Sequence, residues 1–210
     1  MTKKEKIEII DSELKSLYHN PERFLIAGDE FQFLIAVILS AQAQDKVVNV
    51  YTPYLFSKYP NPLSLSKADY EDVLSIIAPI GLGQSKAKNI IALAKELVNK
   101  YDGKIVHDYK TLQSLPGVGS KTAAVFLGEI DHLPYIPVDT HISRIAYRLG
   151  LAGKKASPLK TERMLEKYYK GDEHIEFHRR LILFGRNICL SSNKRKCEIC
   201  PFNFCKERKQ

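Results

Sequence analysis

The sequence lacks a hydrophobic run long enough to cross a membrane. Its longest apolar stretch, FLIAVIL at 33–39, is far shorter than the roughly 18 residues that a membrane span requires. The N-terminal segment MTKKEKIEII also lacks the apolar core of a secretory signal. The first absence excludes a membrane protein and the second argues against secretion, so we expect the protein in the cytoplasm.

Strand signals are missing as well. No segment alternates polar and apolar residues, and there is no low-complexity tract or clear internal repeat. Apolar residues recur instead three or four positions apart, as at Ile7, Ile10, Leu14 and Leu17, which is the period of an amphipathic helix. Hydrophobic residues make up 44% of the 210, which excludes a disordered chain and allows one or two small domains. We therefore predict an all-α fold.

Helix boundaries are predicted from capping residues, glycines and prolines. Ser66, Ser85 and Ser157 are typical helix starts, and Asp139 or Thr140 is expected to cap the helix that follows an extended linker at 132–137. The predicted helices span 4–18, 31–44, 45–58, 66–77, 86–101, 108–114, 120–130, 140–149, 158–170 and 173–188.

Acidic residues are too few to balance the basic ones. There are 24 Asp and Glu against 32 Lys and Arg, a net charge of +8. Such a protein often binds nucleic acid, although an excess of surface lysine gives the same count. Cysteine is scarce too, at four residues. In the cytoplasm, four cysteines indicate a metal site or catalysis more than disulfides.

The stretch LPGVGSKTAAVFLGEI at 115–130 predicts a tight turn between two helices. Gly117 and Gly119 allow positive φ angles and a close approach of the backbone to another surface. Their amides, together with the positive end of the following helix, form an anion site that suits a DNA phosphate without reading sequence. An ordinary turn between helices is the alternative.

Five motifs resemble those of a known family and occur along this chain in the same order as in that family. They are ILSAQAQD (38–45), IGLGQSKAKNI (80–90), LPGVGSKTA (115–123), VDTHI (138–142) and HRRLILFGRNIC (178–189). Together they resemble the endonuclease III family of DNA glycosylases, in the helix–hairpin–helix superfamily. The matches run from about residue 30 to 205, nearly the whole chain.

The resemblance implies that Lys121 is the catalytic amine and Asp139 the catalytic carboxylate. An amine that attacks C1′ of the sugar forms a Schiff base, and β-elimination then cuts the strand on the 3′ side. The helix start beside Lys121 disfavours its ammonium form, and partial burial would act in the same direction. A solvated surface lysine and a plain N-cap aspartate are the alternatives, and Asp139 can fill both roles. His141 either shapes the site or is structural.

The resemblance also implies that Gln42 and Leu82 fill the gap left by a base that has been flipped out of the stack. The alternatives are a surface glutamine on a helix and a core leucine. Family members commonly carry an aromatic residue where this chain has Gly83. This departure makes the loop smaller and more flexible, and it leaves the lesion range open.

The cysteines are spaced C-x7-C-x2-C-x4-C, at Cys189, Cys197, Cys200 and Cys205. Four thiolates can hold an iron–sulfur cluster or a zinc ion, and spacing alone favours neither. The family pattern for its [4Fe–4S] cluster is C-x6-C-x2-C-x5-C. The resemblance therefore favours the cluster, with the inner pair displaced by one residue. Lys194, Arg195 and Lys196 in the first cysteine loop are expected to contact phosphate, unless they only make the tail soluble.

By resemblance the fold has two helical lobes with a cleft between them. Residues 22–132 are expected to form a six-helix barrel-like lobe, with the helix–hairpin–helix at about 108–130. Residues 1–21 and 133–210 are expected to form the second lobe, with the cluster loop at 189–205.

The expected function is that of a bifunctional DNA glycosylase and AP lyase that acts as a monomer on damaged pyrimidines in duplex DNA, in the nucleoid of a microbe. A monofunctional glycosylase of the same superfamily is one alternative, and Lys121 argues against it. A non-catalytic DNA-binding module with a structural metal is another. The pair of Lys121 and Asp139 argues against that module, because binding alone needs neither residue.

Overall fold

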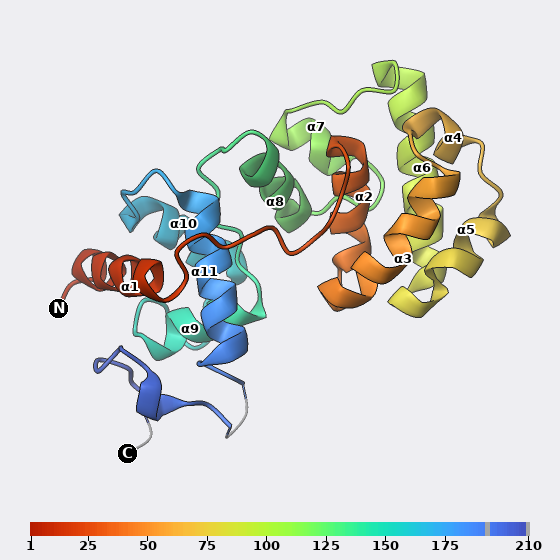
Figure 1. Cartoon of the computed structure of the whole chain (residues 1–210). Coiled ribbons are helices and arrows are strands. Elements are labelled where there is room, and N and C mark those ends of the chain that lie inside the picture. Colours follow the sequence, from red (N-terminus) through yellow and green to blue (C-terminus); the bar gives the residue numbers. More distant parts are fainter. Residues whose placement is uncertain (192–193, 209–210) are drawn as a thin grey trace. The chain divides into compact units, whose positions relative to one another are not determined.

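The computed structural model describes residues 1–191 and 194–208 (Figure 1). All regular secondary structure in these ranges is helical, which confirms the predicted all-α class. No helix in them is long and apolar enough to span a membrane. The chain forms two compact units: unit 1 comprises Met1–Glu22 and His132–Gln210, and unit 2 comprises Arg23–Asp131.

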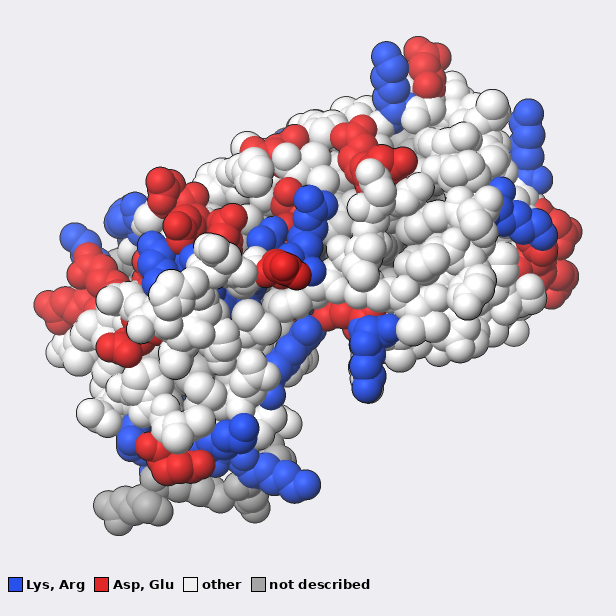
Figure 2. Space-filling model, viewed as in Figure 1, with Lys and Arg blue, Asp and Glu red and all other residues white. Residues whose placement is uncertain are grey.

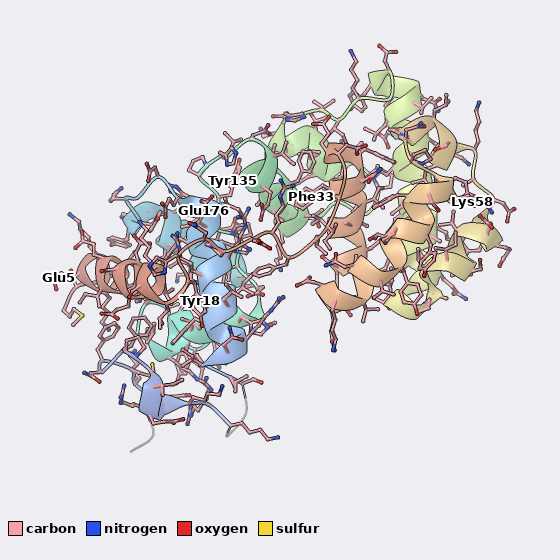
Figure 3. The ribbon with its side chains drawn as sticks, viewed as in Figure 1. Glu5, Tyr18, Phe33, Lys58, Tyr135 and Glu176 are labelled. Carbon is pink, nitrogen blue, oxygen red and sulfur yellow. The ribbon has the colours of Figure 1, made fainter. Side chains whose placement is uncertain are left out.

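Unit 2 is built around one strongly apolar helix. Its elements are α2 (Glu30–Ser40), α3 (Asp45–Lys58), α4 (Pro62–Ser66), α5 (Tyr70–Ile77), η1 (Ala78–Ile80), α6 (Gly83–Tyr101), α7 (Tyr109–Ser114) and α8 (Ser120–Ile130). Helix α2 packs against α3, α6 and α8, and its residues 33–39 are all buried. Phe33 of α2 stacks on Phe126 of α8 with ring centroids 6.2 Å apart (Figure 3). The core of this unit therefore fixes α8, which carries Lys121.

Unit 1 joins the first helix of the chain to the last ones. It contains α1 (Lys3–Leu17), α9 (Thr140–Arg148), α10 (Pro158–Tyr168), α11 (His174–Asn187) and η2 (Cys197–Ile199). Helix α11 packs on α1 and α9. The C-terminal segment is anchored by Phe202, which is fully buried with its ring edge against Phe184 of α11. Ile7, Ile10 and Leu14 of α1 are buried as predicted, whereas Leu17 is exposed at the end of the helix.

Several predicted helix boundaries are wrong, and local capping explains the largest error. The expected helix at 66–77 begins only at Tyr70, where Asp69 is the N-cap, and Ser66 instead ends a separate helix that Asn61 caps. The Asn61 Oδ1 accepts a hydrogen bond from Ser64 N at 2.9 Å, and Pro62 occupies the favoured first position of α4. Asp69 caps α5 in the same way.

Two other helix boundaries lie beside Gln42 and Leu82, the residues that are predicted to enter DNA. Helix α2 ends at Ser40, four residues earlier than predicted, and α6 begins at Gly83, three residues earlier. Helix α3 begins at Asp45, as predicted, and the side chain of Gln44 before it makes no capping hydrogen bond.

The net charge is confined to one unit. Unit 2 contains 11 Lys and Arg and 11 Asp and Glu, whereas unit 1 contains 21 and 13, so unit 1 carries the whole +8. The face of unit 2 that Figure 2 shows has few charged side chains near its centre. Because long-range attraction follows net charge, we expect unit 1 to contribute most of the electrostatic attraction to a polyanion.

A histidine bridge ties three segments of unit 2 together. His107 places Nδ1 2.7 Å from Asp131 Oδ1 and Nε2 3.0 Å from Glu30 Oε2. Its ring also packs edge-on against Phe126, 5.7 Å between centroids. The segment before α7 is thus linked to the start of α2 and to the end of α8. The two carboxylates, Asp131 first, raise the pKa of His107.

This bridge predicts a pH-dependent part of the stability of unit 2. The carboxylates favour charged His107 in the folded protein, so their stabilisation is fully present below the unfolded pKa of about 6.5 and is lost as the pH rises through the higher folded value. We expect the melting temperature of the parent to fall toward that of His107→Ala between about pH 6 and pH 9. If the difference in melting temperature between the two proteins stays constant with pH, His107 stabilises the unit only through its packing on Phe126.

Candidate DNA-binding and catalytic site

The predicted hairpin in unit 2 is confirmed between α7 and α8. Gly117 has φ +80°, and the turn is closed by a hydrogen bond of 3.1 Å from Val118 N to Leu115 O. Leu115 and Val118 are buried and hold the turn against the unit. Gly119 precedes α8 with an ordinary φ of −88°. The two glycines therefore serve different purposes.

Substitution by alanine separates these purposes. A Cβ on Gly117 would lie 3.0 Å from Asn89 Cβ and 3.3 Å from Ile38 Cγ2, at a positive φ. A Cβ on Gly119 would meet nothing within 4 Å. We expect Gly117→Ala to lower the unfolding free energy by about 1–3 kcal/mol. Gly119→Ala should lower the melting temperature less than Gly117→Ala does, because only the N-cap preference of α8 changes. It should weaken binding to duplex DNA, because the methyl group occupies the space that a phosphate needs. Unimpaired DNA binding by Gly119→Ala would show that this turn does not bind a DNA phosphate.

Lys121 is the second residue of α8. Its side chain is exposed, so the expected partial burial is not found. Among the residues that the structure describes, it has no hydrogen-bond or ion-pair partner. The amine is therefore accessible to a substrate and is held beside the positive end of the helix.

Gln42 and Leu82 share an unusual backbone conformation. Gln42 lies in the turn between α2 and α3, Leu82 immediately precedes α6, and both have φ +54°. Both side chains are exposed, Leu82 at 56%. The alternatives of a helical glutamine and a core leucine are thus wrong. A left-handed residue other than glycine costs about 1–3 kcal/mol and is typical of functional loops, so both positions suit side chains that enter DNA.

Gly83 is the first residue of α6 and packs closely on the preceding elements. A Cβ there would lie 3.1 Å from Leu74 Cδ1 and 3.3 Å from Ala78 Cα. A larger residue would require α5 and η1 to move. The absence of a side chain at this position therefore belongs to the packing of unit 2 as well as to the loop.

In unit 1, Asp139 is the N-cap of α9, as predicted. Its Oδ1 accepts a hydrogen bond from Ile142 N at 2.8 Å. Its second oxygen makes no hydrogen bond to the described residues, and the residue is half-buried. The same carboxylate can therefore cap the helix and present a negative oxygen.

Two arginines of α9, which the sequence interpretation missed, connect this helix to the first cysteine. Arg144 donates to the backbone oxygens of Cys189 at 3.0 Å and of Gly185 at 2.9 Å, and it lies 3.1 Å from His141 Nδ1. Buried Arg148 donates to Cys189 Sγ at 3.3 Å. Their spacing of four residues on an amphipathic helix was the available signal. His141 contacts Arg144, and a Cβ on Gly185 would lie 2.9 Å from the His141 Cβ, so close packing fixes the position of this histidine.

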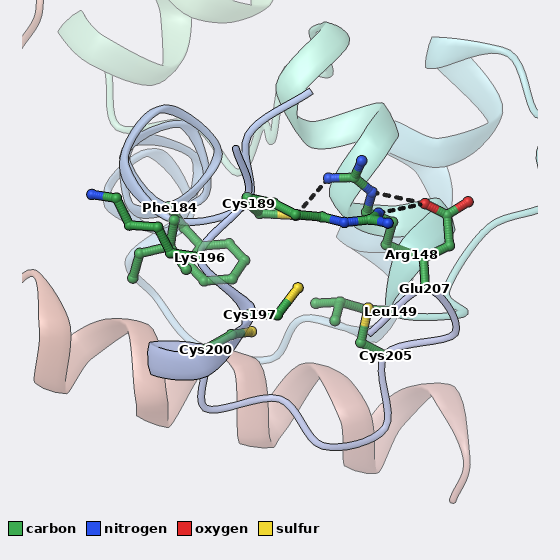
Figure 4. A pocket seen from close by; sticks show the side chains of 11 residues that line it. Arg148, Leu149, Phe184, Cys189, Lys196, Cys197, Cys200, Cys205 and Glu207 are labelled. Atoms are coloured by element: carbon green, nitrogen blue, oxygen red, sulfur yellow. Dashed lines mark hydrogen bonds and ion pairs between the residues drawn. The ribbon is translucent and has the colours of Figure 1, made fainter. Parts of the chain in front are cut away.

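The four cysteines line one pocket (Figure 4). Leu149, Phe184 and Ile188 form its apolar side. Burial raises the pKa of the Cys200 and Cys205 thiols. Arg148 donates to Cys189 Sγ and all four sulfurs line the one pocket, so the donor set fits a cofactor that is held by cysteines. In the described part of the chain, no three His, Cys, Asp or Glu side chains converge tightly enough to hold a single metal ion.

The basic loop between the first two cysteines is not uniformly available to DNA. Lys194 and Lys196 are exposed. Arg195 instead donates to Glu207 Oε2 at 3.1 Å, and Arg148 donates to the same oxygen at 3.1 Å. Arg195 therefore fastens the C-terminal segment to the cysteine loop.

Comparisons with known proteins agree with these features. Residues 35–170 match the HhH-GPD superfamily of base excision DNA repair proteins. Endonuclease III of Rickettsia conorii is 44% identical over 182 residues, 87% of this chain and 86% of its own length. Endonuclease III of Bacillus subtilis is 37% identical over 202 residues, 96% and 92% of the two chains.

A solved structure extends the agreement to the fold. The structure of a trapped endonuclease III–DNA covalent intermediate, an estranged-adenine complex, superposes with a TM-score of 0.93 at 36% identity and covers 99% of this chain and 97% of that one. The chain therefore belongs to the endonuclease III family of the HhH-GPD superfamily.

Proposed function

We propose that the protein removes oxidised pyrimidines from duplex DNA and cuts the strand 3′ to the resulting abasic site. Membership of the endonuclease III family makes it a DNA glycosylase and AP lyase of base excision repair. The accessible Lys121 amine, at the start of a helix behind a phosphate-binding turn, is the observation that supports this function best. Its substrate is chromosomal DNA in a microbial cytoplasm.

In the proposed reaction, neutral Lys121 attacks C1′ of the damaged nucleotide. The new N–C1′ bond forms while the bond between C1′ and the base breaks, and the electron pair leaves with the base, which takes up a proton. The ionised oxygen of Asp139 stabilises the positive charge that develops on the sugar. Opening of the sugar gives a Schiff base on Lys121. Loss of a proton from C2′ then expels the 3′ phosphate.

The remaining predicted residues bind DNA in this proposal. The amides around Gly117 and Gly119 receive a phosphate, and Gln42 and Leu82 occupy the space of the flipped base. Lys194 and Lys196 add phosphate contacts from the basic unit. Arg195 contributes to this surface mainly by holding the loop, because Glu207 engages it.

For the cysteine pocket we favour a [4Fe–4S] cluster held by Cys189, Cys197, Cys200 and Cys205. The four thiolates would hold such a cluster, as they could hold a zinc ion, and membership of the endonuclease III family favours the cluster. When bound, the cluster supplies structure rather than redox chemistry, since hydrolysis and elimination transfer no electrons.

Borohydride trapping tests the proposed function. Wild-type protein should form a covalent adduct with duplex DNA that carries thymine glycol or an abasic site. Lys121→Ala should form none and should lose strand cleavage by at least roughly 10³-fold. Lys104→Ala, which also removes an exposed lysine of unit 2, should behave like the parent. DNA binding by the parent without an adduct would exclude the lyase mechanism.

A further inference from the structure

Unit 1 contains a cavity that none of the proposed catalytic residues lines. Its volume is about 590 Å³, within the range of about 300–1,000 Å³ that is typical of small-molecule sites. It is open to solvent on one side and is bordered by the start of α1, the 151–157 loop and the first two turns of α10. The residues proposed to contact duplex DNA do not line it either.

The lining of the cavity is positively charged and unbalanced. Lys3, Lys155 and Lys160 line it from three different elements, and no acidic residue lines it. None of these three ammonium groups has a hydrogen-bond or ion-pair partner among the residues that the structure describes. Glu5, the nearest acid in the sequence of α1, accepts a hydrogen bond from Thr2 N at 2.9 Å within a capping box. Three like charges around one hollow repel one another unless an anion offsets them.

The loop that carries Lys155 is well supported by the rest of the unit. Lys6 Nζ donates to Leu149 O at 2.9 Å, and Leu151 N donates to Ala146 O at 2.8 Å. The turn is closed by a bond of 3.0 Å from Ala156 N to Gly153 O. The hollow is therefore a feature of the folded unit and does not depend on a loose loop.

The remaining lining is largely apolar. Leu151, Ala152, Ala156 and Met164 line the cavity beside the lysines. Methionine adapts its shape to flat ligands and makes favourable contacts with aromatic rings. A ligand that fits both parts has several negative charges at one end and a flat apolar body at the other.

We propose that this cavity binds a nucleotide that carries at least two phosphate charges, with the phosphates on Lys3, Lys155 and Lys160 and the base against Met164 and Ala156. A free nucleoside diphosphate and the 5′-phosphorylated end of a single strand share this chemistry. Neither Lys121 nor Asp139 lines this cavity, so the proposal stands independently of the proposed reaction.

Isothermal titration calorimetry on the full-length protein with its cofactor tests the proposal. The probes are ADP, inorganic pyrophosphate and a 5′-phosphorylated trinucleotide. ADP should bind at one site, and Lys155→Ala or Lys160→Ala should weaken it roughly tenfold each. Lys154→Ala is the matched control, because Lys154 is the exposed neighbour of Lys155 but does not line the cavity. It should leave the affinity within about twofold.

The outcomes separate the two sources of the phosphate and can overturn the proposal. Tighter binding of the trinucleotide, with the same loss in Lys155→Ala, supports the site and assigns it to a strand end. Pyrophosphate that binds as tightly as ADP overturns it, because the apolar wall would then recognise nothing. No saturable ADP binding, or an equal loss in Lys154→Ala, also overturns it. Unchanged melting temperatures of the variants exclude misfolding as the cause of a loss.

Discussion

Asp139→Asn should lose base removal by roughly 10²–10³-fold while the protein remains as stable as the parent. Asparagine is isosteric with aspartate and caps a helix equally well, so the hydrogen bond from Ile142 N is retained. The negative charge near the developing oxocarbenium ion is what disappears. Asp139→Ala removes the cap as well and should cost about 1 kcal/mol of unfolding free energy in addition.

Single-turnover base release and thermal unfolding, measured on the same preparations, check this result. The pair of variants separates the two functions of one carboxylate, because only the alanine variant should melt earlier. Asn and Ala variants that both retain parental rates would assign Asp139 to capping alone. A slow Asn variant with a lowered melting temperature would mean that the charge also stabilises unit 1.

Loss of one cysteine should have the largest effect on stability. Cys200→Ala should abolish the visible absorption and the bound iron of the proposed cluster and destabilise unit 1 by several kcal/mol, because cofactor binding energy is folding energy. The C-terminal segment has little regular structure to hold it. In the described residues it contains one short 3-10 helix, and its anchors include the Phe202 ring, the hydrogen bond from Lys206 N to Arg148 O and the contacts of Glu207 and Arg208.

Lys196→Ala is the matched control, since Lys196 lines the same pocket but has no thiol. It should retain iron and melting temperature and lose only DNA affinity at low salt. Metal analysis also distinguishes the two cofactors, because iron with inorganic sulfide identifies a cluster and zinc alone contradicts it. A Cys200→Ala protein that keeps the parental melting temperature would show that the cofactor does not stabilise unit 1.

Local sequence determined the boundaries of several helices and the turn between two of them. Period-3.6 patterning and capping residues predicted α7, α8 and α9 within about one residue. Their N-caps are Asp108, Gly119 and Asp139, where short-range preferences and tertiary packing agree. The turn between α7 and α8 could also be predicted from the sequence, because the positive φ at Gly117 is a local requirement of the backbone.

Tertiary structure alone decided the features that depend on contacts between distant segments. The left-handed backbone conformations of Gln42 and Leu82 could not be predicted from the sequence pattern. The same is true of the hydrogen bond from Arg148 to Cys189, which lies 41 residues away. Lys86 reads as an ordinary lysine of an amphipathic helix, yet it is 4% exposed. Periodicity assigns a residue to a face of its own helix, but burial and partners depend on which segments pack against that face.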